Sequence, residues 1–216
     1  MSRLIRFSIL CALVLSPLAA MAETYRIDRG HSSVEFSIRH MVSKVTGQFD
    51  EFSGQIVYDP EAPEKSSVEV TIQTASINTV NERRDNHLRS DDFFEVETYP
   101  EITFKSTSAK ADGEDKLMVT GDLTMHGTTH EVVMPVEVIG VGKHPRRGTP
   151  MAGFEARLTV SRADFGVDHY TDIAKILGDE VTISLNIRAV AGGGRGRGRG
   201  QRGQGGQGSG GDRPGN

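Results

Sequence analysis

Apolar and polar residues alternate with a period of two through most of residues 23–191, and this pattern constrains the fold more than any other feature. Between Glu180 and Val190, valine, isoleucine and leucine occupy every second position up to Ile187, with polar side chains between them. Because successive side chains of a strand point to opposite faces, such a stretch has one dry face and one wet face. The pattern predicts eight to ten strands, at 33–39, 44–49, 53–59, 67–75, 102–108, 116–125, 129–141, 153–161 and 180–190, with 25–28 as a short additional one.

The segments between these strands are mostly short turns. The Asp-Gly pair in 111–115 and the glycine in 125–128 are typical of hairpins, which join antiparallel neighbours. The polar segment 78–94 lacks alternation and predicts a short helix over 81–89, with Ser90 capping a second helical turn. Residues 168–178 predict a further turn of helix across an opening, and the prolines and glycine of 143–150 predict a loop.

Antiparallel strands with one dry face, in a domain of this size, form either a sandwich or a closed barrel. The strands are long and mostly consecutive, and closure removes exposed sheet edges. We therefore expect an all-β fold, a closed antiparallel barrel of about eight strands with one or two short helices. Such a barrel is just wide enough inside for side chains or one small ligand. Gly47, Gly54 and Gly121 lie on predicted strands and fill no volume, which slightly favours an interior space, although glycines also mark bends.

The first 22 residues have the pattern of a secretory signal peptide. Arg3 and Arg6 precede an apolar run over 9–15, and Ala20-Met21-Ala22 is a typical cleavage site. A membrane anchor is the alternative, but the run is shorter than the ~20 residues that span a bilayer. Cleavage before Glu23 would also remove Cys11, the only cysteine, and with it any disulfide or thiolate site. We expect a periplasmic or secreted protein without a transmembrane segment after cleavage.

The charges divide the remaining chain into an acidic domain and a basic tail. Residues 23–191 contain 18 basic and 28 acidic residues, a net charge of −10, so we expect no nucleic-acid partner. Residues 192–216 contain 13 glycines, five arginines and one acidic residue. Such a segment has no apolar surface to bury, which predicts a disordered Gly/Arg-rich tail. The tail either contacts anionic surfaces or is a passive extension.

No arrangement of residues predicts catalysis or metal binding. His126 and His130 have a zinc-like spacing, but Gly127 replaces the glutamate of HExxH, and four strand residues span about 13 Å. His31 and His40 flank a predicted strand, where they either polarise a ligand head group or satisfy backbone groups. There is no nucleophile elbow, Walker loop or dinucleotide fingerprint. We therefore predict no catalytic residue, no metal and no cofactor.

Five segments, in order along 23–191, resemble the YceI-like polyisoprenoid-binding family. They are YRIDRGHSSVEFSIRHMVSKVTGQFDEFSG at 25–54, LRSDDFFEVETYPEITFKS at 88–106, GDLTMHGTTHEVVMPV at 121–136, DFGV at 164–167 and VTISLNIRA at 181–189. The resemblance implies an extended lipocalin-like barrel whose pore holds a long isoprenoid chain, often in a periplasmic protein. It implies no catalytic residues, and the Gly/Arg tail is an addition to the usual domain.

The leading hypothesis is therefore a non-enzymatic carrier or binder of a polyisoprenoid or similar long-chain lipid. Dry-face residues would form the wall of its site: Phe36, Ile38, Phe49, Val70, Ile72, Phe104, Leu123, Met125, Phe154, Leu158, Ile183 and Leu185. A tightly packed barrel would show the same alternation. Two alternatives stay open, a ligand-free stress or scaffold protein that contacts partners through its tail, and a histidine-dependent enzyme acting on a lipid. A homodimer is also left open.

Overall fold

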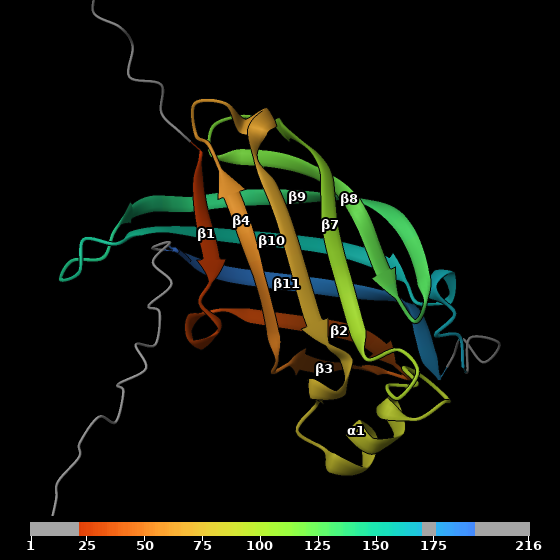
Figure 1. Cartoon of the computed structure of the whole chain (residues 1–216). Helices are drawn as coiled ribbons and strands as arrows, with labels where there is room; N and C mark the ends of the chain where they lie inside the picture. Colours follow the sequence, from red (N-terminus) through yellow and green to blue (C-terminus); the bar gives the residue numbers. More distant parts are fainter. Residues whose placement is uncertain (1–21, 170–175, 193–216) are drawn as a thin grey trace, which may run out of the picture.

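The protein folds as a closed antiparallel β-barrel with an α-helix at one end (Figure 1). A computed structural model describes residues 22–169 and 176–192. Its strands are β1 (Glu23–Ile27), β2 (Ser33–His40), β3 (Ser43–Phe49), β4 (Phe52–Tyr58), β5 (Ser67–Gln73), β6 (Ile77–Asn78), β7 (Glu101–Ala111), β8 (Lys116–Met125), β9 (Thr128–Lys143), β10 (Pro150–Ser161) and β11 (Leu177–Ala191). Its helix is α1 (Glu82–Arg89), and single 3₁₀ turns occupy Arg29–His31, Pro63–Lys65, Thr74–Ser76 and Ala163–Phe165.

Eight of these strands form the ring, in the order β1-β4-β5-β7-β8-β9-β10-β11, and pairing of β1 with β11 closes it. The strand β11 has two partners on one edge, because its end near Ala191 pairs with β1 and its earlier part pairs with β2. The strands β2, β3 and β6 extend the sheet from that second contact. The predicted closed barrel of about eight strands is therefore confirmed.

The predicted strands correspond closely to the observed ones. The stretch 116–125 matches β8 residue for residue, and the others differ by a few residues at their ends. The largest differences are at β7, β9, β10 and β11, which continue for up to three residues beyond the predicted limits. The two-residue strand β6 was not predicted, because two residues are too few to show alternation.

The helix α1 begins one residue after the predicted start. Its N-cap is Asn81, whose side-chain oxygen accepts a hydrogen bond from the Arg84 backbone N–H at 3.0 Å. A turn does follow Ser90 at 91–94, where the Phe93 N–H donates to the Ser90 carbonyl oxygen at 3.1 Å. The Ser90 hydroxyl does not cap that turn: Ser90 ends α1, and its hydroxyl donates to the His87 carbonyl oxygen at 2.7 Å. The helical turn predicted at 168–178 falls mainly on 170–175, outside the described residues, and its last residues, Leu177 and Gly178, belong to β11.

The prediction that strand glycines leave interior space needs correction at Gly47 and Gly121, because phenyl rings occupy the space beside them. A β-carbon on Gly47 would lie 2.4 Å from the ring of Phe36, its direct partner across β2 and β3. A β-carbon on Gly121 would lie 2.6 Å from the ring of Phe104. These glycines let the two rings lie along the barrel wall. They accommodate side chains rather than leave empty volume beside themselves.

Candidate functional site

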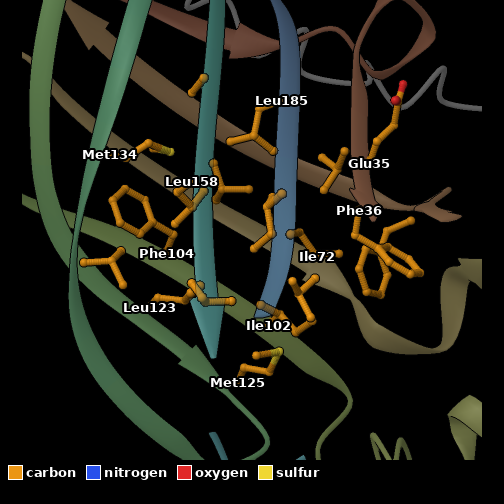
Figure 2. A pocket seen from close by; sticks show the side chains of 18 of the residues that line it. Glu35, Phe36, Ile72, Ile102, Phe104, Leu123, Met125, Met134, Leu158 and Leu185 are labelled. Carbon is orange, nitrogen blue, oxygen red and sulfur yellow. The ribbon is translucent and has the colours of Figure 1, made fainter. Parts of the chain in front are cut away.

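The inward side chains of the barrel enclose a cavity of about 810 Å³. Its wall is mostly aliphatic and aromatic, and Figure 2 shows these side chains converging from several strands. This volume lies in the range of cavities that hold one small organic ligand. All twelve residues predicted from the dry faces line it: Phe36, Ile38, Phe49, Val70, Ile72, Phe104, Leu123, Met125, Phe154, Leu158, Ile183 and Leu185. Their role in binding remains a prediction.

The middle of the barrel is hollow. Val70 and Ile72 on β5, Leu158 on β10, and Ile183 and Leu185 on β11 all point inward, yet they are only half-buried. In a close-packed core such side chains would contact other atoms on every side. Their remaining accessible surface faces the cavity, so this alternation lines a space instead of filling one.

One end of the barrel is sealed. The rings of Tyr58 and Phe154 meet edge to face at a centroid distance of 5.6 Å. Ala152 and Ala189, paired across β10 and β11, are 2% and 0% exposed, and Tyr25 is also buried. Burial raises the pKa of the Tyr58 phenol, as do the nearby carboxylates of Asp115 and Asp59. We give the name sealed end to the five residues Tyr25, Tyr58, Ala152, Phe154 and Ala189; Tyr58 and Phe154 line the cavity there.

The opposite end carries cationic and polar side chains. His40 on β2 lines the cavity there, together with Asn81, Arg83, Arg84 and His87 in and before α1. Two acidic residues, Glu35 and Glu155, also border the cavity, but both are exposed. Figure 2 shows the carboxylate of Glu35 turned away from the apolar side chains. The α1 end is therefore the polar end of an otherwise apolar cavity.

A compact network attaches α1 to the barrel. Asp85 is buried, and its carboxylate accepts hydrogen bonds from the backbone N–H and the hydroxyl of Thr79. The guanidinium of Arg84 donates to the Thr79 hydroxyl at 2.7 Å and to its carbonyl oxygen at 2.8 Å. Arg89 donates to the carbonyl oxygens of Ala75 and Ile77, both at 2.7 Å. Fully bonded buried polar groups hold a fixed geometry, so α1 is a firm cover over part of this end.

Arg162, just after β10, is a buried cation in the cavity wall at the same end. Its Nε donates to the Gly178 carbonyl oxygen at 2.9 Å, and its Nη1 donates to those of Val167 and His169 at 2.7 Å. Among the described residues, no acceptor lies within hydrogen-bond distance of its Nη2. Burial lowers the pKa of the guanidinium, although the Asp179 and Asp168 carboxylates oppose this shift.

The histidine pair points in two directions. The ring of His126 packs against Tyr99 at a centroid distance of 4.4 Å, and its Nε2 lies 3.8 Å from a carboxylate oxygen of Glu95. His130 instead reaches the Asp164 carbonyl oxygen at 2.9 Å and packs against Phe165. Within the described ranges, no group of three or more His, Cys, Asp or Glu residues could hold a metal ion.

The other two candidate histidines have different surroundings. His40 borders the cavity, where a histidine could contact a ligand head group. His31 contacts Asp28 and Arg188, so it belongs to an ion-pair cluster between the turn that follows β1 and the strand β11, rather than to the cavity. Sequence reasoning missed Arg162 and the arginines of α1 as parts of the site, since neither alternation nor a known motif marks them.

Together, the closed ring and its apolar cavity define a hollow antiparallel β-barrel of the ligand-binding class. The chain belongs to the YceI-like domain family, whose profile matches residues 25–189. Protein YceI of Escherichia coli is 39% identical over 182 residues, which cover 83% of this chain and 93% of that one.

Two solved structures show the same architecture. BcnA of Burkholderia cenocepacia is 29% identical with a TM-score of 0.70, over 75% of this chain and 98% of that one. A domain of Saccharophagus degradans described as polyisoprenoid-binding is 21% identical with a TM-score of 0.61, over 78% of this chain and 98% of that domain. Within the described residues, no helix has the length and apolar character needed to span a bilayer.

Proposed function

We propose that this protein binds one long-chain lipid, of the polyisoprenoid class, in the cavity of its barrel. The observation that carries the proposal is the enclosed cavity of about 810 Å³ with an almost entirely apolar wall. Transfer of an apolar chain from water into such a space is favourable by ~25 cal/mol per Å² of buried surface. The fold shared with a domain described as polyisoprenoid-binding supports the choice of lipid class.

The polarity of the cavity supports one orientation of the ligand. The isoprenoid tail would run toward Tyr58 and Phe154 at the sealed end, where the wall is apolar. The polar head would lie at the α1 end, where Arg162 Nη2 is a buried donor without an acceptor among the described residues. A buried donor is costly while it has no partner, so an oxygen of the head group would gain a strong hydrogen bond there.

The protein would act as a carrier or binder rather than as an enzyme. We also propose export, with residues 1–22 removed and Glu23 as the first residue of the mature protein, because the basic, apolar and small-residue regions follow each other in the required order. The N-terminal residue of protein recovered from the cell envelope tests the cleavage. Recovery of membrane-bound chains that retain Cys11 would contradict it.

The test of lipid binding is native mass spectrometry of the purified protein, together with extraction and identification of any bound lipid. Wild-type protein should carry one prenyl lipid, or take one up after delipidation. Leu123→Glu, which places a carboxylate in the cavity wall, should lose the lipid; circular dichroism establishes whether it folds. Leu123→Phe is the uncharged companion if the first variant unfolds. A delipidated wild-type protein that takes up no prenyl lipid would overturn the proposal.

A further inference from the structure

Three large apolar side chains project into solvent at the α1 end. Val42 and Val80 are 103% and 96% exposed, and Met41 is 53% exposed. Met41 and Val42 form the tip of the hairpin between β2 and β3, and Val80 lies just before α1. Single exposed apolar residues are common, but these three, two of them fully exposed, lie on two separate loops at one end of the barrel.

The backbone around two of these residues has an unfavourable conformation. Met41 has φ of 51° and Val80 has φ of 58°, a region that residues other than glycine rarely adopt and that is least favourable for a β-branched residue such as Val80. Hydrogen bonds hold both conformations: the Met41 N–H donates to the Ile176 carbonyl oxygen at 2.7 Å, and the Val80 N–H donates to the Asn78 side chain at 2.9 Å. A strained backbone that presents an apolar side chain to water stabilises nothing in the isolated protein, which points to a role in contact with a partner.

Both loops lie at the rim of the cavity. His40, which precedes Met41, and Asn81, which follows Val80, both line the cavity wall. The loops are also linked through the sheet, because β3 pairs with β6, and Thr79 lies close to Gly47. Figure 1 shows α1 at this end of the barrel. We call Met41, Val42 and Val80, with the charged residues that flank them, the rim.

The rim has the opposite charge to the rest of the domain. Its two segments, 39–44 and 80–84, contain Arg39, Lys44, Arg83 and Arg84 and a single acidic residue, Glu82. This net charge of +3 stands against −10 for residues 23–191 as a whole. Apolar tips surrounded by arginine and lysine suit the surface of an anionic bilayer. Its negatively charged head groups would contact the basic side chains, and its hydrocarbon layer lies just beneath them.

We propose that the rim docks on an anionic phospholipid bilayer. Met41, Val42 and Val80 enter the head-group region, while Arg39, Lys44 and Arg83 contact lipid phosphates. The α1 end of the cavity then faces the membrane, so that a lipid can pass between bilayer and barrel with little exposure to water. The docking surface rests on its own exposure and charge, and only this transfer step rests on the proposed function.

The experiment is vesicle flotation of the mature full-length protein. Vesicles of phosphatidylcholine with 30 mol% phosphatidylglycerol are compared with vesicles of phosphatidylcholine alone, at low and high salt. We expect binding to the anionic vesicles, weakened by salt. Met41→Asn, Val42→Ser and Val80→Asn combined should reduce binding at least tenfold, and asparagine suits the positive φ of two of these positions. Lys44→Gln and Arg83→Gln should each reduce it about fivefold at low salt.

The matched control is a second set of exposed apolar residues, Val133, Ile139 and Val141 on β9. Changing all three to serine should leave binding within twofold of wild type. A second control lacks residues 192–216, since their five arginines could bind the same vesicles. Docking through the rim is overturned if the wild type fails to bind anionic vesicles, if the β9 control loses as much binding as the rim variant, or if removal of the tail abolishes binding.

The outcomes also separate this proposal from lipid binding in the cavity. A protein that binds anionic vesicles through the rim but never takes up a prenyl lipid supports docking and contradicts the proposed function. A protein that takes up the lipid but leaves anionic vesicles unbound contradicts docking and leaves the proposed function intact.

Discussion

The sealed end and the hollow middle of the barrel have the same alternating sequence and opposite packing. At the sealed end, Tyr58 and Phe154 reach across the barrel and meet, and the alanines at 152 and 189 allow close approach. In the middle, the inward valine, isoleucine and leucine side chains stay half-buried and line a cavity instead of filling it. The two large rings there, Phe36 and Phe104, lie against glycines of neighbouring strands, along the wall.

This comparison shows that alternation defines which residues face inward, whereas side-chain size and cross-strand partners decide whether the interior is filled. Two phenyl rings that could have crossed the middle of the barrel are instead directed to its wall by Gly47 and Gly121. The cavity is therefore a consequence of particular residue pairs, and substitutions at the two regions should have different effects.

The largest expected contrast is between two truncations to alanine. Phe154→Ala at the sealed end removes a buried ring that contacts Tyr58, and should lower the free energy of unfolding by about 3–5 kcal/mol. Leu158→Ala, four residues along the same strand, removes a half-buried side chain that already borders a space, and should cost about 2 kcal/mol or less. Urea unfolding of both delipidated variants measures the difference; equal losses would mean that the middle is packed.

The next largest loss of stability is expected at the glycines beside Phe36 and Phe104, which keep these two rings at the barrel wall. In Gly121→Ala, the new β-carbon would lie 2.6 Å from both the Lys105 carbonyl oxygen and the Phe104 ring. We expect a loss of about 1–3 kcal/mol, because the backbone oxygen cannot move freely. Gly140→Ala is the control, since a β-carbon there meets no atom within 4 Å. Thermal melts should separate the two variants, and a neutral Gly121→Ala would contradict the packing described.

A third prediction adds volume instead of removing it. Ile183→Phe should enter the cavity and change stability by less than about 1.5 kcal/mol, while reducing the amount of bound prenyl lipid. Ala189→Leu at the sealed end should cost about 1–3 kcal/mol or more, because Ala189 is completely buried. Calorimetry and lipid mass spectrometry on the same samples give both readouts. A stable Ala189→Leu would show that the sealed end has room.

The smallest expected change in stability concerns Asp28, which lies outside the sealed end and accepts hydrogen bonds from Arg188. This interaction holds the pKa of Asp28 below its ordinary value, and His31 contributes to the same shift. A lowered folded-state pKa adds stability above the unfolded value of about 3.9, and that stability is lost as the pH falls through the folded-state pKa. Asp28→Asn should therefore cost roughly 0.5–1 kcal/mol at pH 7 and less at pH 3. Urea unfolding at the two pH values tests this; a constant difference would contradict the linkage.

The sequence was sufficient to predict the strands other than β6, the helix α1 and the inward set, because alternation and its interruption are local patterns. Closure of the barrel followed from the need to cover sheet edges. It was insufficient for features that depend on register. The contact between Phe36 and Gly47 requires that β2 and β3 pair at one particular offset. Arg162 follows a strand in an ordinary polar segment, and only the fold places it in the cavity wall. The hollow middle likewise depends on side-chain sizes and cross-strand partners, which alternation does not specify.

The two partners of β11 also determine the order in which this barrel can be completed. Both β1 and β2 pair with the last strand, and Asp28 contacts Arg188 across 160 residues of sequence. Contacts between such distant residues form slowly, because a long loop must close first. A chain synthesised from its N-terminus holds β1 and β2 without this partner until β11 exists, so the ring closes last. The cavity therefore has a complete wall only after the last strand to be synthesised has paired with one of the first.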